Sequence, residues 1–375
     1  MSTGVYQLPD LLALLPKKPG GDISPHFKEA DTGFNAWVHK KLGWFFAKVR
    51  VYNAEMPLLA AVAWPLASCQ ELRAILAYMT SSFMLEELTD RCSSTKVVDN
   101  SQLWINTLRD TDGGKTSRHP FIKTMRKELV PMMKAAVDPF HWPQFIAANE
   151  RFAKNVIREA FVRDADVNEN AVNNIQSYTI MRRETIGTRP CFVLMRSTRR
   201  LYIPDDVLAH PLMEEMEDVA IDMVSIANDI YSFKKEYGDN GALTNLLTII
   251  QKDPTTDHLD LQERIRYATK LFNAALDRFH SCRQKLPSFG DVALDRHVSS
   301  YADGLVDWIV GNIEWSIVNH RYNTFVHEKD RRNNIMRLNS RLLSSQHFIL
   351  FFIVTVLSIL FGHLPVQSLY RVFYA

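Results

Sequence analysis

The sequence predicts an all-α protein, a single helical bundle around a central cavity. Apolar residues recur at helical spacing in one segment after another, and no stretch alternates apolar and polar residues between hairpin turns. With 375 residues, 46% hydrophobic and 23% charged, the chain can bury a large core. Its net charge is only +2 and no basic run interleaves with aromatics, so we expect no nucleic-acid partner.

The helical pattern divides the chain into segments separated by breakers. Residues 1–35 contain Pro19-Gly20-Gly21 and are expected to form an irregular arm. Residues 93–117 are polar and turn-rich and are expected to form a surface loop, since Arg109 stands where a phosphate-binding G-x-x-x-x-G-K-T motif needs glycine. Helices are expected over 35–52, 60–67, 71–90, 119–137, 142–162, 168–186, 205–217, 218–237, 242–251, 259–284 and 291–319.

The cysteine pattern indicates a reducing compartment. Four cysteines lie far apart with no C-x-x-C pair, namely Cys69, Cys92, Cys191 and Cys282. This argues against a disulfide scaffold or a zinc site. Residues 1–15 lack a basic start followed by a long apolar core, so we expect no secretory signal and a cytoplasmic protein.

The C-terminal end is unusually apolar. Residues 348–361 are interrupted only by Thr355 and Ser358, and with the residues that follow they near the roughly 20 needed to span a bilayer. One interpretation is a membrane anchor or interfacial helix. The others are a short helix packed on the domain and an extension unrelated to the function of the domain. We therefore expect a main helical domain over 1–335 and an apolar tail over 345–375.

The run 219–237 carries polar groups on an apolar helix face. At 100° per residue, Asn228, Ser232 and Glu236 fall within about 80° of one another, and Lys235 lies beside them. Such groups are costly to bury unless something satisfies them. A Mg²⁺ ion that also holds a phosphate group would do so, whereas a solvated polar stripe is the alternative.

A second acidic pair ends the helix expected over 71–90. Glu86 and Asp90 are one helical turn apart, on the face that also carries Met79 and Phe83. Two carboxylates at this spacing repel each other unless a cation lies between them. The pair therefore predicts a second set of metal ligands, with a charged helix end as the alternative.

Together these runs resemble the two metal motifs of class I terpene synthases. Residues 228–236 resemble the N-D-x-x-S-x-x-K-E motif, and Glu86 to Asp90 resemble D-[DE]-x-x-D, with Glu86 where the family usually has aspartate. From about residue 7 to about residue 335, the chain is similar to the fungal, basidiomycete-type sesquiterpene synthases. The resemblance implies three Mg²⁺ ions held by these ligands.

A segment before the second motif resembles the family's R-R-x-T-x-G element, in which one arginine senses diphosphate. Arg182 is our choice from its distance upstream of Asn228, with Arg183 as the alternative. Gly187 and Pro190 are expected to break the helix here. Carbonyls exposed at such a break could stabilise a carbocation.

Arg321 and Tyr322 resemble the family's C-terminal R-Y pair. There the arginine binds diphosphate with both arms of its guanidinium and the tyrosine adds a hydroxyl donor. We expect Lys235 to bind diphosphate as well. Candidate pocket walls are Phe83, Trp308 and Trp315, although core packing would also explain these aromatics.

The resemblance implies a lyase that ionises farnesyl diphosphate with Mg²⁺, releases diphosphate and gives a sesquiterpene hydrocarbon or alcohol. One alternative is a synthase of an acyclic alcohol such as nerolidol or linalool, from farnesyl or geranyl diphosphate. Another is a non-catalytic, membrane-tethered protein that binds prenyl diphosphate, which Glu86 and the apolar tail would suit. A chain-elongating synthase would need a second aspartate-rich motif, which residues 228–232 do not supply.

Overall fold

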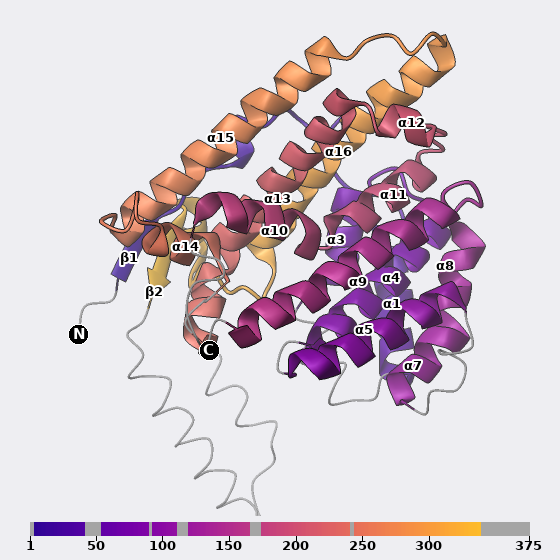
Figure 1. Ribbon diagram of the computed structural model, residues 1–375, viewed down its shortest axis with the longest axis horizontal. Helices are drawn as coiled ribbons and strands as arrows, with labels where there is room; N and C mark the ends of the chain where they lie inside the picture. Colours follow the sequence, from indigo (N-terminus) through magenta and orange to yellow (C-terminus); the bar gives the residue numbers. More distant parts are fainter. Residues whose placement is uncertain are drawn as a thin grey trace, which may run out of the picture.

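The computed structural model describes residues 4–41, 54–89, 92–110, 119–165, 174–240 and 244–338. Over these residues the protein is a helical bundle with one two-stranded sheet (Figure 1). The all-α prediction is therefore confirmed. No helix among the described residues is long and apolar enough to cross a membrane. The apolar run 348–361 lies outside them, so the division into 1–335 and 345–375 stays a prediction.

The described elements have the following bounds, with the strands and short helical turns given first. The strands and short helical turns are β1 (Gly4–Gln7), η1 (Leu12–Leu14), η3 (Met125–Leu129, a π-helical turn) and β2 (Ile335–Leu338). The α-helices are α1 (Phe27–Lys41), α3 (Met56–Ala63), α4 (Cys69–Thr89), α5 (Ser94–Arg109), α7 (Pro120–Thr124), α8 (Val130–Ala136), α9 (Trp142–Ala165), α10 (Ile175–Thr185), α11 (Thr188–Thr198), α12 (Asp205–Leu208), α13 (Pro211–Asn240), α14 (Leu246–Lys252), α15 (Leu261–Lys285), α16 (Val292–Val318) and α17 (Glu328–Arg332).

Helix α13 is the centre of the bundle. It packs against α15 and α16, beside which it runs in Figure 1, and also against α10 and α14. Its middle is apolar on nearly every side, as in Val219, Ala220, Ile221 and Ile226, all of them buried. A helix that is hydrophobic all round belongs in a protein interior. This burial fixes the rotation of α13 and hence the direction of its few polar side chains.

The largest difference from the predicted elements is α5. The polar segment expected to be a loop is helical from Ser94 to Arg109, and Val97, Trp104 and Leu108 are buried. Their spacing of seven and four residues makes an apolar stripe, while the serines and asparagines between them mask it in the sequence. Residues 111–118 lie outside the described part of the chain.

The N-terminal arm also has more structure than expected. Helix α1 begins at Phe27 rather than at residue 35, and β1 pairs antiparallel with β2, Gly4 opposite Leu338 and Gln7 opposite Ile335. A four-residue strand is too short for period-2 alternation to reveal it. Helix α13 continues to Asn240, past the expected stop at Gly238.

Candidate active site

The polar face predicted on α13 is present. Asn228, Ser232 and Glu236 lie at successive turns of the continuous helix, on the side where α10 and the segment after α16 approach. Ser232 is buried, and Asn228 and Glu236 are half-buried. Lys235, also half-buried, precedes Glu236 on the same helix.

Helix α10 brings Arg182 to this face. Its Nη2 donates to Asn228 Oδ1 at 2.9 Å and to Asp229 Oδ1 at 3.2 Å. Tyr178, one turn earlier on α10, donates its hydroxyl to Asp229 Oδ2 at 2.6 Å. Burial alone would lower the pKa of Arg182, but Asp229 and other anionic groups around it raise that pKa above its ordinary value. The guanidinium therefore stays charged beside Asn228.

The neighbouring Arg183 points elsewhere. Its guanidinium binds both carboxylate oxygens of Asp222 at 2.6 Å and Asp218 Oδ2 at 2.7 Å. A bidentate pair of this kind holds an arginine firmly. Of the two arginines, Arg182 therefore lies beside Asn228, whereas Arg183 forms ion pairs with carboxylates in the first half of α13.

Arg321 and Tyr322 connect the two motif helices. The Tyr322 hydroxyl accepts a hydrogen bond at 2.5 Å from Nδ2 of Asn228, which lies on α13. Arg321 Nη2 lies 3.9 Å from Glu86 Oε2, on α4, and the guanidinium stands 4.9 Å from the centre of the Phe83 ring. Burial raises the pKa of Tyr322, so its hydroxyl keeps its proton to donate. Two consecutive residues thus reach both predicted metal motifs.

A continuous series of contacts therefore connects five predicted site residues on α10, α13, the segment after α16, and α4. They are Arg182, Asn228, Tyr322, its sequence neighbour Arg321, and Glu86. Glu236 adds a contact to Asn245, whose Nδ2 lies 2.9 Å from Glu236 Oε2. Asp90, the remaining predicted ligand, lies outside the described residues.

The donor atoms on α13 fit a hard cation. Among the described residues, Ser232 Oγ is buried and has no hydrogen-bond partner. An orphaned buried hydroxyl is costly, and a metal ion would satisfy it. Amide, hydroxyl and carboxylate oxygens are the ligands Mg²⁺ prefers. The described residues hold no group of three or more histidine, cysteine or acidic side chains placed to bind a metal ion. A site here would therefore use Asn228 and Ser232 as well as carboxylates.

Three residues of this region were not predicted: Asp229, Tyr178 and Asn245. Asp229 is rotated about 100° from Asn228, off the predicted face, and is 1% exposed. The sequence does offer one signal for Asp229. A carboxylate inside an apolar run is expected to be buried, and a buried charge needs partners. Tyr178 and Asn245 carried no such signal, since their partners are distant in sequence.

The helix break is confirmed at Gly187 but not at Pro190, which lies in the first turn of α11, where a proline is tolerated. Helix α10 ends at Thr185, and Gly187, with φ +74°, precedes α11. This left-handed conformation favours glycine. The break places Arg182 in the last turn of α10.

The aromatic side chains proposed as walls pack mainly into the core. Trp308 meets Trp64 and Phe192 edge-on, with ring centres 5.5 and 5.8 Å apart. Trp315 donates to the Ala54 carbonyl at 2.7 Å and packs against the Tyr322 ring. Trp315 thus packs against the tyrosine of the R-Y pair, and the ring of Phe83 faces the guanidinium of Arg321.

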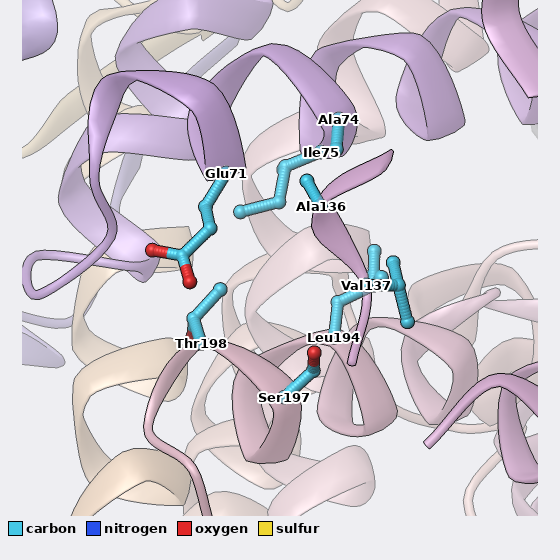
Figure 2. Close-up of a pocket in the computed structure, with 8 residues that line it drawn as sticks. All are labelled: Glu71, Ala74, Ile75, Ala136, Val137, Leu194, Ser197 and Thr198. Carbon is cyan, nitrogen blue, oxygen red and sulfur yellow. The ribbon is translucent and has the colours of Figure 1, made fainter. Parts of the chain in front are cut away.

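A small pocket lies away from these residues. Figure 2 shows it between α4 and α11, where Glu71, Ile75 and Leu194 line it. Glu71 is paired with Arg200 Nη1 at 2.6 Å. The pocket has room for about one water molecule and contains no predicted site residue. It is therefore too small to hold a substrate.

Comparison with known proteins gives a consistent family. The model of terpene synthase family 2, C-terminal metal binding, matches residues 77–278. Sesquiterpene synthase 1 of Postia placenta is 28% identical over 298 residues, covering 79% of this chain and 85% of that protein. A delta(6)-protoilludene synthase of Stereum hirsutum is 28% identical over 325 residues, covering 84% and 83%.

Solved structures share the fold. Germacradien-4-ol synthase from Streptomyces citricolor has a TM-score of 0.66 at 20% identity, covering 79% of this chain and 95% of that one. Hedycaryol synthase in complex with nerolidol has a TM-score of 0.64 at 18% identity, covering 83% and 100%. The family model spans more than half of the chain, including α4 from residue 77 onward and all of α13. The chain therefore belongs to terpene synthase family 2 and is a lyase that acts on a prenyl diphosphate.

Proposed function

We propose that the protein is a Mg²⁺-dependent sesquiterpene synthase that ionises farnesyl diphosphate to a carbocation and releases diphosphate, giving a sesquiterpene hydrocarbon or alcohol. The observation that carries the proposal is the series of contacts around Asn228. Asn228 hydrogen-bonds both Arg182 and Tyr322, and Arg321, next to Tyr322, lies beside Glu86. These contacts bring cationic and hydroxyl donors next to the oxygen ligands of both predicted metal motifs, on α4 and on α13. Relatives named sesquiterpene synthases support farnesyl diphosphate as the substrate.

Each polar residue has a proposed role. The ligands for three Mg²⁺ ions are Glu86, Asp90, Asn228, Ser232 and Glu236. Bound Mg²⁺ supplies positive charge that neutralises the diphosphate leaving group. Arg182, Lys235, Arg321 and Tyr322 bind the diphosphate oxygens. In this proposal residues 1–335 form the catalytic domain.

The chemistry requires no protein nucleophile. The allylic carbon–oxygen bond breaks heterolytically, its electron pair leaves with diphosphate, and an allylic cation remains. Arg182 and Arg321 are permanently charged, so they oppose the negative charge that develops on the leaving group. Apolar side chains of the bundle interior then keep bulk water from the cation. The cation ends as a hydrocarbon by losing a proton, or as an alcohol by adding one water molecule and losing a proton from it.

The direct test is to incubate the full-length protein with farnesyl and geranyl diphosphates, with and without Mg²⁺. We expect a Mg²⁺-dependent sesquiterpene from farnesyl diphosphate, identified by gas chromatography and mass spectrometry. Nerolidol or linalool as the sole product would favour the acyclic-alcohol alternative. A folded protein that binds prenyl diphosphate but gives no volatile would instead support the non-catalytic alternative.

A substitution at Glu86 tests the first motif. We expect Glu86→Asp to keep turnover or raise it by up to about threefold, since aspartate is the family's usual residue and a shorter side chain holds a metal with less conformational freedom. The isosteric Glu86→Gln, which lacks the charge, should lose turnover. Steady-state kinetics at saturating Mg²⁺ would measure both. An inactive Glu86→Asp enzyme would show that the site is built around the longer side chain.

A further inference from the structure

We propose that Asn245 is a positioning residue for the metal site, because it holds the carboxylate of Glu236 in place. This inference rests on the proposed function, in which Glu236 is a Mg²⁺ ligand. Asn245 Nδ2 donates to Glu236 Oε2 at 2.9 Å and to the backbone carbonyl of Asp229 at 2.8 Å. Its Oδ1 accepts from the Leu247 backbone N–H at 2.9 Å.

These bonds fix the amide of Asn245 in one orientation. The side chain is completely buried, and both amide donors and the carbonyl oxygen have named partners. Turning the amide over would place its oxygen against the Asp229 carbonyl and the Glu236 carboxylate, and its NH₂ group against the Leu247 N–H. The donor therefore always faces Glu236.

The support behind Asn245 is rigid as well. It is the N-cap of α14, and the next residue, Leu246, donates its backbone N–H to Asp229 Oδ2 at 3.0 Å. The start of α14 is thus attached to α13 at both the main chain and the side chain of Asp229. Asn245 cannot shift relative to α13 without breaking these bonds.

Glu236 benefits from this support more than a shorter ligand would. It lies near the end of α13, is half-buried, and has a long side chain that loses rotamer freedom on binding a metal. An ionised carboxylate has about four lone-pair sites, so one bond from Asn245 to Oε2 leaves others for a cation. Asn245 therefore orients Glu236 in advance, as outer hydrogen-bond partners commonly do for metal ligands.

The test separates this contact from helix capping. Asn245→Ser and Asn245→Thr both keep a hydroxyl that can cap α14. Their shorter side chains carry one hydroxyl hydrogen in place of the two amide hydrogens that bond Glu236 and the Asp229 carbonyl. Asn174 offers a matched control, because it is the N-cap of α10 and accepts from the Ser177 N–H at 2.8 Å. Asn174→Ser makes the same chemical change at a cap that lies on another helix.

Mg²⁺ binding is measured by isothermal titration calorimetry in the presence of inorganic diphosphate. We expect both Asn245 variants to bind Mg²⁺ about tenfold more weakly than the wild type, and Asn174→Ser to bind it normally. The Mg²⁺ concentration for half-maximal turnover should rise by a similar factor, while kcat at saturating Mg²⁺ is retained. Circular dichroism would confirm that each variant is folded; the threonine variant fills more of the vacated volume.

Two outcomes would overturn the inference. Wild-type Mg²⁺ affinity in a folded Asn245 variant would show that the contact does not position Glu236. An equal loss in Asn174→Ser would show that the effect belongs to helix capping. A wild-type protein that binds neither Mg²⁺ nor diphosphate would instead refute the proposed function itself, so the two failures are distinguishable.

Discussion

Ser232→Ala is expected to lose about 100-fold or more in turnover while its melting temperature stays at or above that of the wild type. A bound metal stabilises the transition state by several kcal/mol, and about 1.4 kcal/mol corresponds to each tenfold in rate. The hydroxyl is buried and has no partner among the described residues, so its removal costs the metal-free protein no hydrogen bond. Steady-state kinetics and thermal unfolding without metal would measure both effects.

Ser101→Ala is the matched control. Ser101 lies on α5, is also buried, and its hydroxyl likewise has no partner in the described part of the chain. The two variants make the same chemical change in similar burial, but only one touches the proposed metal site. We expect Ser101→Ala to keep full turnover. Unchanged turnover in Ser232→Ala would remove this residue from the ligand set.

The features that the sequence predicts well are those that helical geometry fixes locally. The common face of Asn228, Ser232 and Glu236 follows from a period of 3.6 residues, and the apolar neighbours ensure that the face is not simply solvated. The helix break at Gly187 follows from backbone chemistry alone. Such features depend on neighbours within one or two turns.

The features that it misses depend on contacts between distant segments. No local pattern tells that Asn245 reaches Glu236, that Tyr178 reaches Asp229, or that consecutive residues of the R-Y pair face different helices. These pairings are set by the packing of α10, α13 and α14. Helix α5 was missed for a different reason, since its polar residues outnumber the few buried ones that define its stripe.

The second large effect concerns the buried ion pair of Arg182 and Asp229. The side chains are 19% and 1% exposed. We expect Arg182→Met to reduce turnover about 100-fold or more and to destabilise the protein by about 3 kcal/mol, because removing one partner leaves a buried charge uncompensated. Urea unfolding would measure the free energy. Arg183→Met is the control: it should also destabilise, by losing Asp218 and Asp222, but the folded variant should keep turnover.

The double variant Arg182→Met with Asp229→Asn separates the structural role of the pair from its role in catalysis. A neutral amide at 229 can still accept from the Leu246 N–H or from Tyr178, so much of the lost stability should return. Turnover should not return, because no guanidinium remains to bind diphosphate. If turnover recovered together with stability, Arg182 would be only a structural partner of Asp229. Comparable turnover in Arg182→Met and Arg183→Met would likewise reject Arg182 as the diphosphate-binding arginine.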